Sequence, residues 1–130
     1  MPDTIFTKII RGDIPREVIY EDEYVMAIPD RFPSMEGQTL VVTKKQVGYI
    51  FDLDTPTYHA LMDAVQKVAL ALDVAFHTVR TAVIIEGFEV PHVHVRLYPC
   101  TTEITTLSPR HEATDAELKI VADKIRAVLK

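Results

Sequence analysis

The sequence is most informative at Val90-Pro-His-Val-His-Val-Arg-Leu-Tyr-Pro99. Apolar and polar side chains alternate along this stretch, which is the two-residue period of a β-strand with two different faces. The face expected to enter the core holds Val93, Val95 and Leu97. The opposite face is expected to hold His92, His94, Arg96 and Tyr98. We therefore predict a strand over residues 92–98 with one apolar face and one face available for chemistry.

Phosphate chemistry would use this second face well. A neutral imidazole can attack phosphorus and form a covalent phosphohistidine, and a guanidinium two residues further on can bind two phosphate oxygens. The guanidinium would also offset the charge that develops as a leaving group departs. The alternative, from the residues alone, is a solvated strand face that carries His92, His94 and Arg96 by chance.

The composition excludes several classes of protein. With 130 residues, the chain can bury about two-thirds of its unfolded surface in one domain without disulfides or metal. Its single cysteine, Cys100, excludes an internal disulfide and favours a reducing, cytoplasmic setting. Its four glycines are too far apart for a Walker A loop or a G-x-G-x-x-G turn, so a bound phosphate must be held in another way.

The charge balance favours a small-molecule partner. With 14 basic and 19 acidic side chains, the formal net charge is -5, which argues against loose binding to DNA or RNA but leaves room for a local anion site. The longest stretch without Asp, Glu, Lys or Arg runs from Thr55 to Met62, far short of the roughly 20 residues that span a bilayer. We therefore expect neither a nucleic-acid partner nor a membrane segment.

The other elements are predicted from hydrophobic periods and from start and stop residues. Helices are expected at 4–10, 55–76 and 114–129. Strands are expected at 17–21, 24–29, 39–43 and 81–85. Thr55 is the expected N-cap of the long helix, and Thr114 and Glu117 have the form of a capping box for the last one. This order of elements predicts a single α+β domain over residues 1–130 with an antiparallel sheet.

Four blocks of sequence, taken in order, resemble a known family. They are Ile-Phe-x-Lys-Ile-Ile-x-Gly-x-Ile-Pro from Ile5, Tyr-Glu-Asp-Glu from Tyr20, Leu-Val-Val-x-Lys-Lys from Leu40, and the histidine strand. On these blocks the chain is similar to the histidine triad (HIT) superfamily of nucleotide hydrolases and transferases. The resemblance implies a HIT-like five-stranded antiparallel sheet crossed by a long helix, with a family core over about 4–100 and a C-terminal extension. It also implies a two-fold homodimer with a continuous ten-stranded sheet.

The resemblance assigns roles to single residues. His94 matches the histidine that attacks the α-phosphate and forms a nucleotidyl-histidine intermediate, and His92 matches a supporting histidine. Asp30 falls where an acid hydrogen-bonds ribose hydroxyls, and Ile28 where an apolar side chain packs on the base. Gly87 falls where a backbone amide approaches phosphate, which the absence of a Cβ permits. The plainer alternatives are a turn residue at Asp30, core packing at Ile28 and a turn glycine at Gly87.

The departures from the family pattern concern proton transfer and phosphate contact. Arg96 stands in place of the third histidine, and its permanent charge cannot shuttle a proton at neutral pH. Gln38 stands in place of a further histidine and can hydrogen-bond but not exchange protons. A shortened loop, residues 86–90, places Glu86 and Glu89 where hydrogen-bond donors are expected. Either acid would repel a phosphate or, if protonated, act as the missing proton donor.

Some members of the family bind a structural zinc through Cys-x-x-Cys near the start and a histidine after the Lys-Lys pair. The residues at these positions are Thr4, Thr7 and Gln46. Hydroxyl and amide groups do not replace thiolates for zinc, so we expect no such metal and no other cofactor. A different metal on the H-x-H pair, His92 and His94, would need a third ligand from the 86–90 loop.

Three functional hypotheses remain from the sequence. The leading one is a hydrolase or nucleotidyl transferase for purine nucleotide conjugates, with His94 as nucleophile, Arg96 as phosphate clamp and Asp30 as ribose ligand. The second is a noncatalytic module that kept the nucleotide pocket but lost proton transfer. The third is a small metal-binding protein that uses His92 and His94. His111, in the polar connection before the last helix, is expected in a solvated loop.

Overall fold

The computed structural model describes residues 2–104, 107 and 109–130. Its elements in chain order are α1 (Ile5–Arg11), β1 (Tyr20–Glu21), β2 (Val25–Pro29), β3 (Thr39–Thr43), the 3-10 helix η1 (Ile50–Asp52), α2 (Thr55–Phe76), β4 (Arg80–Ile84), β5 (His94–Cys100) and α3 (Asp115–Val128). The strands form one antiparallel sheet in the order β1-β2-β3-β5-β4. The expected α+β class with a five-stranded antiparallel sheet is confirmed.

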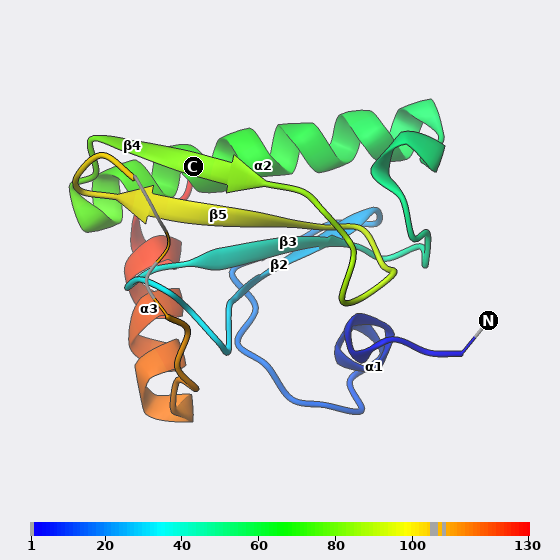
Figure 1. Cartoon of the computed structure of the whole chain (residues 1–130), viewed down its shortest axis with the longest axis horizontal. Coiled ribbons are helices and arrows are strands. Elements are labelled where there is room, and N and C mark those ends of the chain that lie inside the picture. The colour runs from blue at the N-terminus through cyan, green and yellow to red at the C-terminus, as the bar shows by residue number, and fades with distance from the viewer. Residues whose placement is uncertain (1, 105–106, 108) are drawn as a thin grey trace.

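The main core lies between one face of the sheet and α2, which runs along the strands (Figure 1). Strand residues of this core include Val25, Val41, Val95 and Leu97. Helix residues of this core include Leu61, Val65, Val68 and Leu72 of α2, and Ala122 and Ile125 of α3. These are the inward positions that the two-residue period of the strands and the helical stripes predict.

The opposite face of the sheet is partly covered by α1. A smaller core there consists of Phe6, Ile9, Met26, Ile28, Leu40 and Val42. Thr4 caps α1 and Gly12 ends it at φ 89°, a left-handed conformation that favours glycine. His94 is only 2% exposed, and the ring of Phe6 from α1 packs against it. Tyr98, on the same face of β5, is 3% exposed. The face of β5 that carries the histidines is therefore enclosed, which the alternation of its side chains does not reveal.

Several element boundaries differ from the sequence prediction by one or two residues, and β1 begins three residues later than expected, covering Tyr20–Glu21 instead of 17–21. β5 begins at His94, because the backbone amides of His92 and Val93 donate to Val90 and Val47 rather than to a strand partner. The expected strand start at His92 is therefore wrong by two residues. The N-cap of α2 is Asp54 and not Thr55, which becomes the first helical residue. Both residue types suit an N-cap, so the sequence left this choice undetermined.

The capping box expected at the last helix is present. The Glu117 amide donates to Thr114 Oγ1 at 3.1 Å, and the Thr114 amide donates to Glu117 Oε1 at 3.0 Å. α3 then packs on α2 and β2 through Leu118, Ala122 and Ile125. Among the helices of the described ranges, none combines the length and apolarity needed to cross a bilayer.

Candidate active site

His94 is held in one orientation at the start of β5. Its Nδ1 lies 2.6 Å from the backbone carbonyl oxygen of His92, and because a carbonyl only accepts, Nδ1 carries the hydrogen. In the neutral ring this leaves the lone pair on Nε2. The ring of Phe6, from α1, packs against the imidazole with centroids 4.8 Å apart. This arrangement presents a nucleophilic nitrogen in a fixed direction.

His92 is fully buried, and both of its ring nitrogens are engaged. Nε2 lies 2.6 Å from the Thr43 carbonyl and therefore donates, so Nδ1 accepts from the Thr4 hydroxyl at 2.7 Å. Burial lowers the pKa of His92, and the nearby His94 lowers it further, against the opposing effect of the Thr43 carbonyl. His92 is thus a neutral support for His94 rather than a reacting group.

The three positions at which the family resemblance implies zinc ligands, Thr4, Thr7 and Gln46, are joined by hydrogen bonds. Thr7 Oγ1 donates to Gln46 Oε1 at 2.8 Å, and Gln46 Nε2 donates to the Pro2 carbonyl at 2.7 Å. Thr4 Oγ1 lies 3.1 Å from Thr7 Oγ1 and connects this group to His92. The sequence identified Thr4, Thr7 and Gln46 but not their link to His92, which lies far away in the chain. We call these four residues the His92 network.

Arg96 lies on the same face of β5 as His94 and faces three carboxylates. The separations from its guanidinium nitrogens are 3.9 Å to Asp30, 3.7 Å to Glu86 and 3.9 Å to Glu89. Glu86 Oε1 is also 3.9 Å from His94 Nε2. Arg96 Nε and Glu86 Oε1 are buried without a hydrogen-bond partner among the described residues. Buried polar atoms rarely stay unpaired, so this cluster has the capacity to bind a further polar group.

Asp30 and Gln38 form a buried pair rather than two separate ligands. Gln38 Nε2 donates to Asp30 Oδ2 at 2.7 Å, and the Phe32 amide donates to Asp30 Oδ1 at 2.9 Å. Gln38 Oε1 accepts from the Ser34 amide at 2.7 Å. Asp30 therefore closes a turn, as the plainer interpretation has it, while Oδ2 still faces Arg96. Gln38 orients Asp30 from behind and is not brought into contact with His94.

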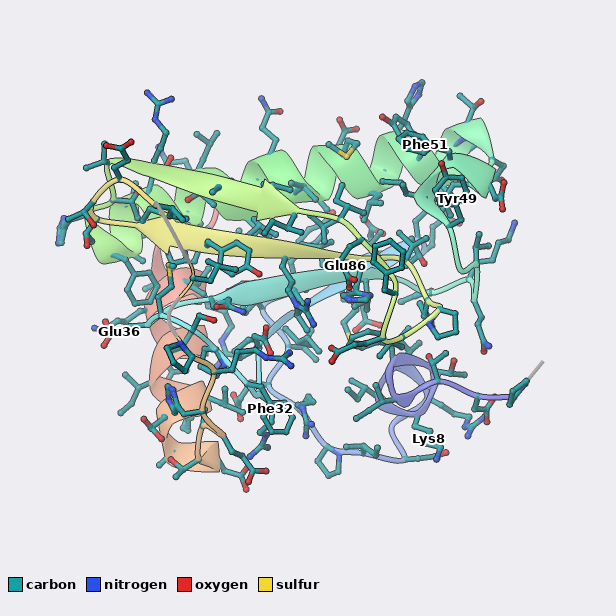
Figure 2. The ribbon with its side chains drawn as sticks, in the orientation of Figure 1. Lys8, Phe32, Glu36, Tyr49, Phe51 and Glu86 are labelled. Atoms are coloured by element: carbon teal, nitrogen blue, oxygen red, sulfur yellow. The ribbon has the colours of Figure 1, made fainter. Side chains whose placement is uncertain are left out.

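A cleft of about 330 Å³ lies between α1 and the sheet, beside this charged cluster. Its apolar lining includes Phe6, Ile9, Ile28, Phe32 and Leu40. Its polar lining includes Arg16, Asp30, Arg31, Glu89, Arg96 and Arg110. Ile28, Leu40 and Arg96 are consecutive cross-strand partners over β2, β3 and β5, so the apolar floor leads directly to the guanidinium. In Figure 2, Phe32 lies on the α3 side of the cleft and Glu86 lies near β5.

The loop from Glu86 to Val90 follows a path that requires its glycine. Gly87 has φ 74°, and a Cβ there would lie 3.1 Å from the Gly48 carbonyl oxygen. The Phe88 amide donates to Glu86 Oε2 at 2.9 Å, which fixes the carboxylate. Gly87 is thus a turn glycine in close contact with a neighbouring loop.

The geometry does not fit a metal on the H-x-H pair. Both nitrogens of His92 are already hydrogen-bonded, so it would have to lose a partner to bind a cation. Within the described ranges, no three His, Cys, Asp or Glu side chains are grouped as metal ligands. The Thr4, Thr7 and Gln46 set likewise lacks the thiolate and imidazole ligands that zinc requires.

Sequence reasoning missed one charged group at the site, Arg110. Arg110 lies 3.6 Å from Glu89 and lines the cleft, although no motif marks it. The backbone of the segment before α3 bonds to the loop after β2, through Ala113 to Arg31 and His111 to Pro33. His111 is exposed, as expected for a solvated loop, and its backbone is tied to the loop after β2.

Comparisons with known proteins identify the family of this chain. The family model described as "HIT domain" matches residues 11–102. An uncharacterized HIT-like protein of Methanocaldococcus jannaschii is 36% identical over 100 residues, covering 73% of this chain and 77% of that protein. A protein named adenosine 5'-monophosphoramidase hnt1, from Schizosaccharomyces pombe, is 28% identical over 131 residues, covering 97% and 98%.

Solved structures show the same fold. A Hit-like protein from Bartonella henselae superposes with a TM-score of 0.90 at 35% identity, covering 98% of this chain and 96% of that one. A protein described as a hypothetical histidine triad nucleotide-binding protein, from Sulfolobus tokodaii, superposes with a TM-score of 0.84 at 26% identity, covering 95% and 89%. With the enclosed histidine strand and the family match over most of its length, this chain belongs to the HIT domain family.

Proposed function

We propose that this protein is a hydrolase or nucleotidyl transferase that acts at the α-phosphate of a purine nucleotide conjugate, such as a phosphoramidate or a dinucleoside polyphosphate. The observation that carries the proposal is the orientation of His94. Its Nδ1 hydrogen is fixed on the His92 carbonyl, so the Nε2 lone pair is available next to Arg96. A similar protein named as an adenosine monophosphoramidase, and another described as nucleotide-binding, support the substrate class.

The apolar and charged ends of the cleft would fix the orientation of a bound nucleotide. The base would pack on the apolar end, which includes Ile28, while Asp30 would accept hydrogen bonds from ribose hydroxyls with the remaining lone pairs of its carboxylate. The α-phosphate would then lie at Arg96, whose Nε is unpartnered among the described residues. The backbone around Gly87 would approach the phosphate from the other side.

The chemistry would proceed through a covalent intermediate. His94 Nε2 attacks phosphorus, the bond to the leaving group breaks, and the nucleotidyl group is carried on Nε2. Water, or another acceptor in a transferase, then attacks phosphorus and the bond to Nε2 breaks. Arg96 stabilises the negative charge that develops on the phosphate oxygens, a contribution that is large in an enclosed site.

A noncatalytic nucleotide-binding module is the second candidate. It is favoured by Arg96 and Gln38, since neither side chain exchanges protons at neutral pH and Gln38 is engaged with Asp30. Such a module would bind nucleotide in the same cleft without turnover.

One experiment separates the two candidates. The protein is incubated with adenosine phosphoramidate and with dinucleoside polyphosphates, and nucleoside monophosphate and a nucleotidyl-protein adduct are measured. Product and adduct that are lost in His94→Ala support the enzyme. Nucleotide binding without product or adduct supports the module, and the absence of both binding and turnover contradicts the proposed function.

We also propose a homodimer in the cytoplasm. β4 is an edge strand of the sheet, and Val83 and Ile84 on it are partly exposed, as are Leu70 and Val74 on the neighbouring α2. Apolar side chains next to an open strand edge favour association with a second copy. The cytoplasmic setting is supported by Cys100, a single buried thiol that has no disulfide partner.

A further inference from the structure

The proposed reaction needs a group that gives and takes a proton, and three nearby side chains cannot do so. Arg96 keeps its charge at neutral pH. His92 has both ring nitrogens engaged, with Thr4 and with the Thr43 carbonyl. Asp30 accepts from Gln38 and from a backbone amide, and is oriented toward Arg96 rather than toward His94.

Glu86 is positioned for this role. Its Oε2 is held by the Phe88 amide, and its Oε1 is buried with no hydrogen-bond partner among the described residues. Oε1 lies 3.9 Å from His94 Nε2 and 3.7 Å from an Arg96 nitrogen. These separations are too long for direct hydrogen bonds. A phosphoryl oxygen, a leaving group or a water beside Nε2 would therefore meet this carboxylate oxygen.

Glu89, on the same loop, lacks these properties. Its side chain is 62% exposed, and it pairs with Arg96 at 3.9 Å and Arg110 at 3.6 Å on the solvent side of the cluster. It is not in ion-pair range of His94, whereas Glu86 is. The two acids thus carry the same charge, lie on the same loop and both contact Arg96. Only Glu86 also lies near His94. Glu89 is the matched control for Glu86.

We propose that Glu86 is the catalytic acid and base of this site, in place of the third histidine of the family, an inference that rests on the proposed function. In the first step Nε2 of His94 bonds to phosphorus, the bond to the leaving group breaks, and protonated Glu86 gives its proton to that group. In the second step water attacks phosphorus, the bond from phosphorus to Nε2 breaks, and the Glu86 carboxylate takes the proton of the water. Glu86 is then protonated again, so the cycle balances as conjugate plus water giving leaving group plus nucleotide.

A substrate with a good leaving group separates the two steps. The p-nitrophenyl ester of AMP needs no acid in the first step, because p-nitrophenolate departs as an anion. In Glu86→Gln we expect a burst of about one p-nitrophenolate per site, followed by turnover slowed at least 100-fold relative to the wild type. Acid-quenched intact mass should show a nucleotidyl adduct that accumulates in this variant and is absent when His94→Ala is added. Glu89→Gln removes a carboxylate with the same Arg96 contact but no contact with His94, so it should slow steady-state turnover at least about tenfold less than Glu86→Gln does.

With adenosine phosphoramidate, whose leaving nitrogen needs a proton, Glu86→Gln should slow adduct formation as well. Glu86→Asp, which keeps a carboxylate on a shorter arm, should recover part of the rate. AMP affinity and the thermal unfolding midpoint of Glu86→Gln are measured in parallel to establish that the variant is folded and binds nucleotide.

The role of Glu86 is overturned if Glu86→Gln turns over as fast as Glu89→Gln, or if a folded, AMP-binding Glu86→Gln shows no burst while the wild type does. Failure of the proposed function has a different signature, which is a wild-type protein that forms neither product nor adduct with any of these conjugates; both proposals then fall together.

Discussion

At Arg96, one guanidinium is surrounded by carboxylates that do not touch it. The distances to Asp30, Glu86 and Glu89 lie between 3.7 and 3.9 Å, outside hydrogen-bond range. The cation is thus held in place electrostatically, while its Nε has no hydrogen-bond partner among the described residues and is available to a phosphate. Without this cation, three carboxylates would face the phosphate position, and their negative charge would oppose binding.

Arg96→Gln should weaken AMP binding about 10- to 100-fold, because a charge-assisted contact worth roughly 1.5–3 kcal/mol is lost. Isothermal titration calorimetry measures the change. Arg110→Gln, a half-exposed cation at the rim of the cleft, is the control and should change the affinity by less than about threefold. Equal losses in the two variants would show that Arg96 contributes only general positive charge.

His92 makes stability depend on pH in a defined direction. Its pKa in the folded protein is below the ordinary value of 6.5, so the unfolded chain binds a proton that the folded chain excludes. The stabilising contribution of neutral His92 is therefore complete above about pH 6.5 and is lost as the pH falls below that value. The thermal unfolding midpoint should fall more steeply from about pH 7.5 to 5.5 in the wild type than in His92→Gln. Parallel pH profiles would contradict this assignment.

The residues of the site were predictable from sequence to different degrees. The alternation along β5 predicted the shared face of His94 and Arg96, and the family resemblance supplied Asp30. The carboxylates around Arg96 were not predictable as neighbours, because Asp30 joins them only through the pairing of β2, β3 and β5. The Thr4 hydroxyl on His92 is a contact across 88 residues, and local patterns contain no information about it.

At the scale of elements, α1 and the chain before it determine how His94, the proposed nucleophile, is held. Thr4 and Thr7 form the capping box of α1, and the same hydroxyls belong to the His92 network. The carbonyl of His92 in turn orients His94. A helix of 7 residues thus couples its own cap to the orientation of the His94 imidazole on β5. A change at the start of α1 should therefore affect chemistry as well as stability.

The His92 network should be convertible into a zinc site. Thr4, Thr7, Gln46 and His92 already have polar atoms 2.7–3.1 Å apart along the chain of contacts. The triple variant Thr4→Cys, Thr7→Cys, Gln46→His supplies two thiolates and a second imidazole, a tetrahedral set for zinc. We expect about one zinc per chain by elemental analysis and a thermal midpoint that a chelator lowers.

The control for this conversion keeps both cysteines but has Gln46→Asn, which removes the fourth ligand. It should bind zinc at least tenfold more weakly. If the triple variant folds and binds no zinc, the four positions do not converge closely enough, and the proposed equivalence of the network with a metal site is wrong.

The element boundaries show where sequence rules are sufficient. The capping box at Thr114 is correct, since its two reciprocal hydrogen bonds depend only on local spacing. The start of β5 was placed too early because the amides of His92 and Val93 bond to the 86–90 loop and to Val47, which are contacts that no periodicity encodes. The helix pattern predicted that α2 exists, but Asp54 and Thr55 were equally suitable caps.

For the whole molecule, the fold was predictable because the apolar residues of its two cores recur with the periods of helices and strands. Assembly depends instead on which apolar side chains remain exposed on the surface. The main core uses the stripes of α2 and α3, and the smaller one uses α1. Apolar side chains remain outside both cores on α2, where Leu70 is 61% and Val74 is 56% exposed. α2 lies alongside β4, an edge strand of the sheet, as the proposed dimer requires (Figure 1).

The dimer proposal predicts that Leu70→Arg combined with Val74→Glu gives a monomer. Burying these charges in an interface core is unfavourable, so the equilibrium should shift by at least 100-fold in dissociation constant. Light scattering after gel filtration measures the mass, which should be twice that of one chain for the wild type. Ile120→Arg, an equally exposed apolar position on α3, should remain dimeric. A monomeric wild type would contradict the proposal directly.

The His92 network has a consequence for the conditions under which the protein can work. A zinc–thiolate support loses its metal when zinc is scarce, and its sulfurs are targets of peroxide. Hydroxyls and an amide at Thr4, Thr7 and Gln46 have neither weakness, and the single thiol, Cys100, is buried away from them. The orientation of His94 therefore depends neither on metal supply nor on the oxidation state of thiols, so the proposed activity should persist through metal starvation and oxidative stress.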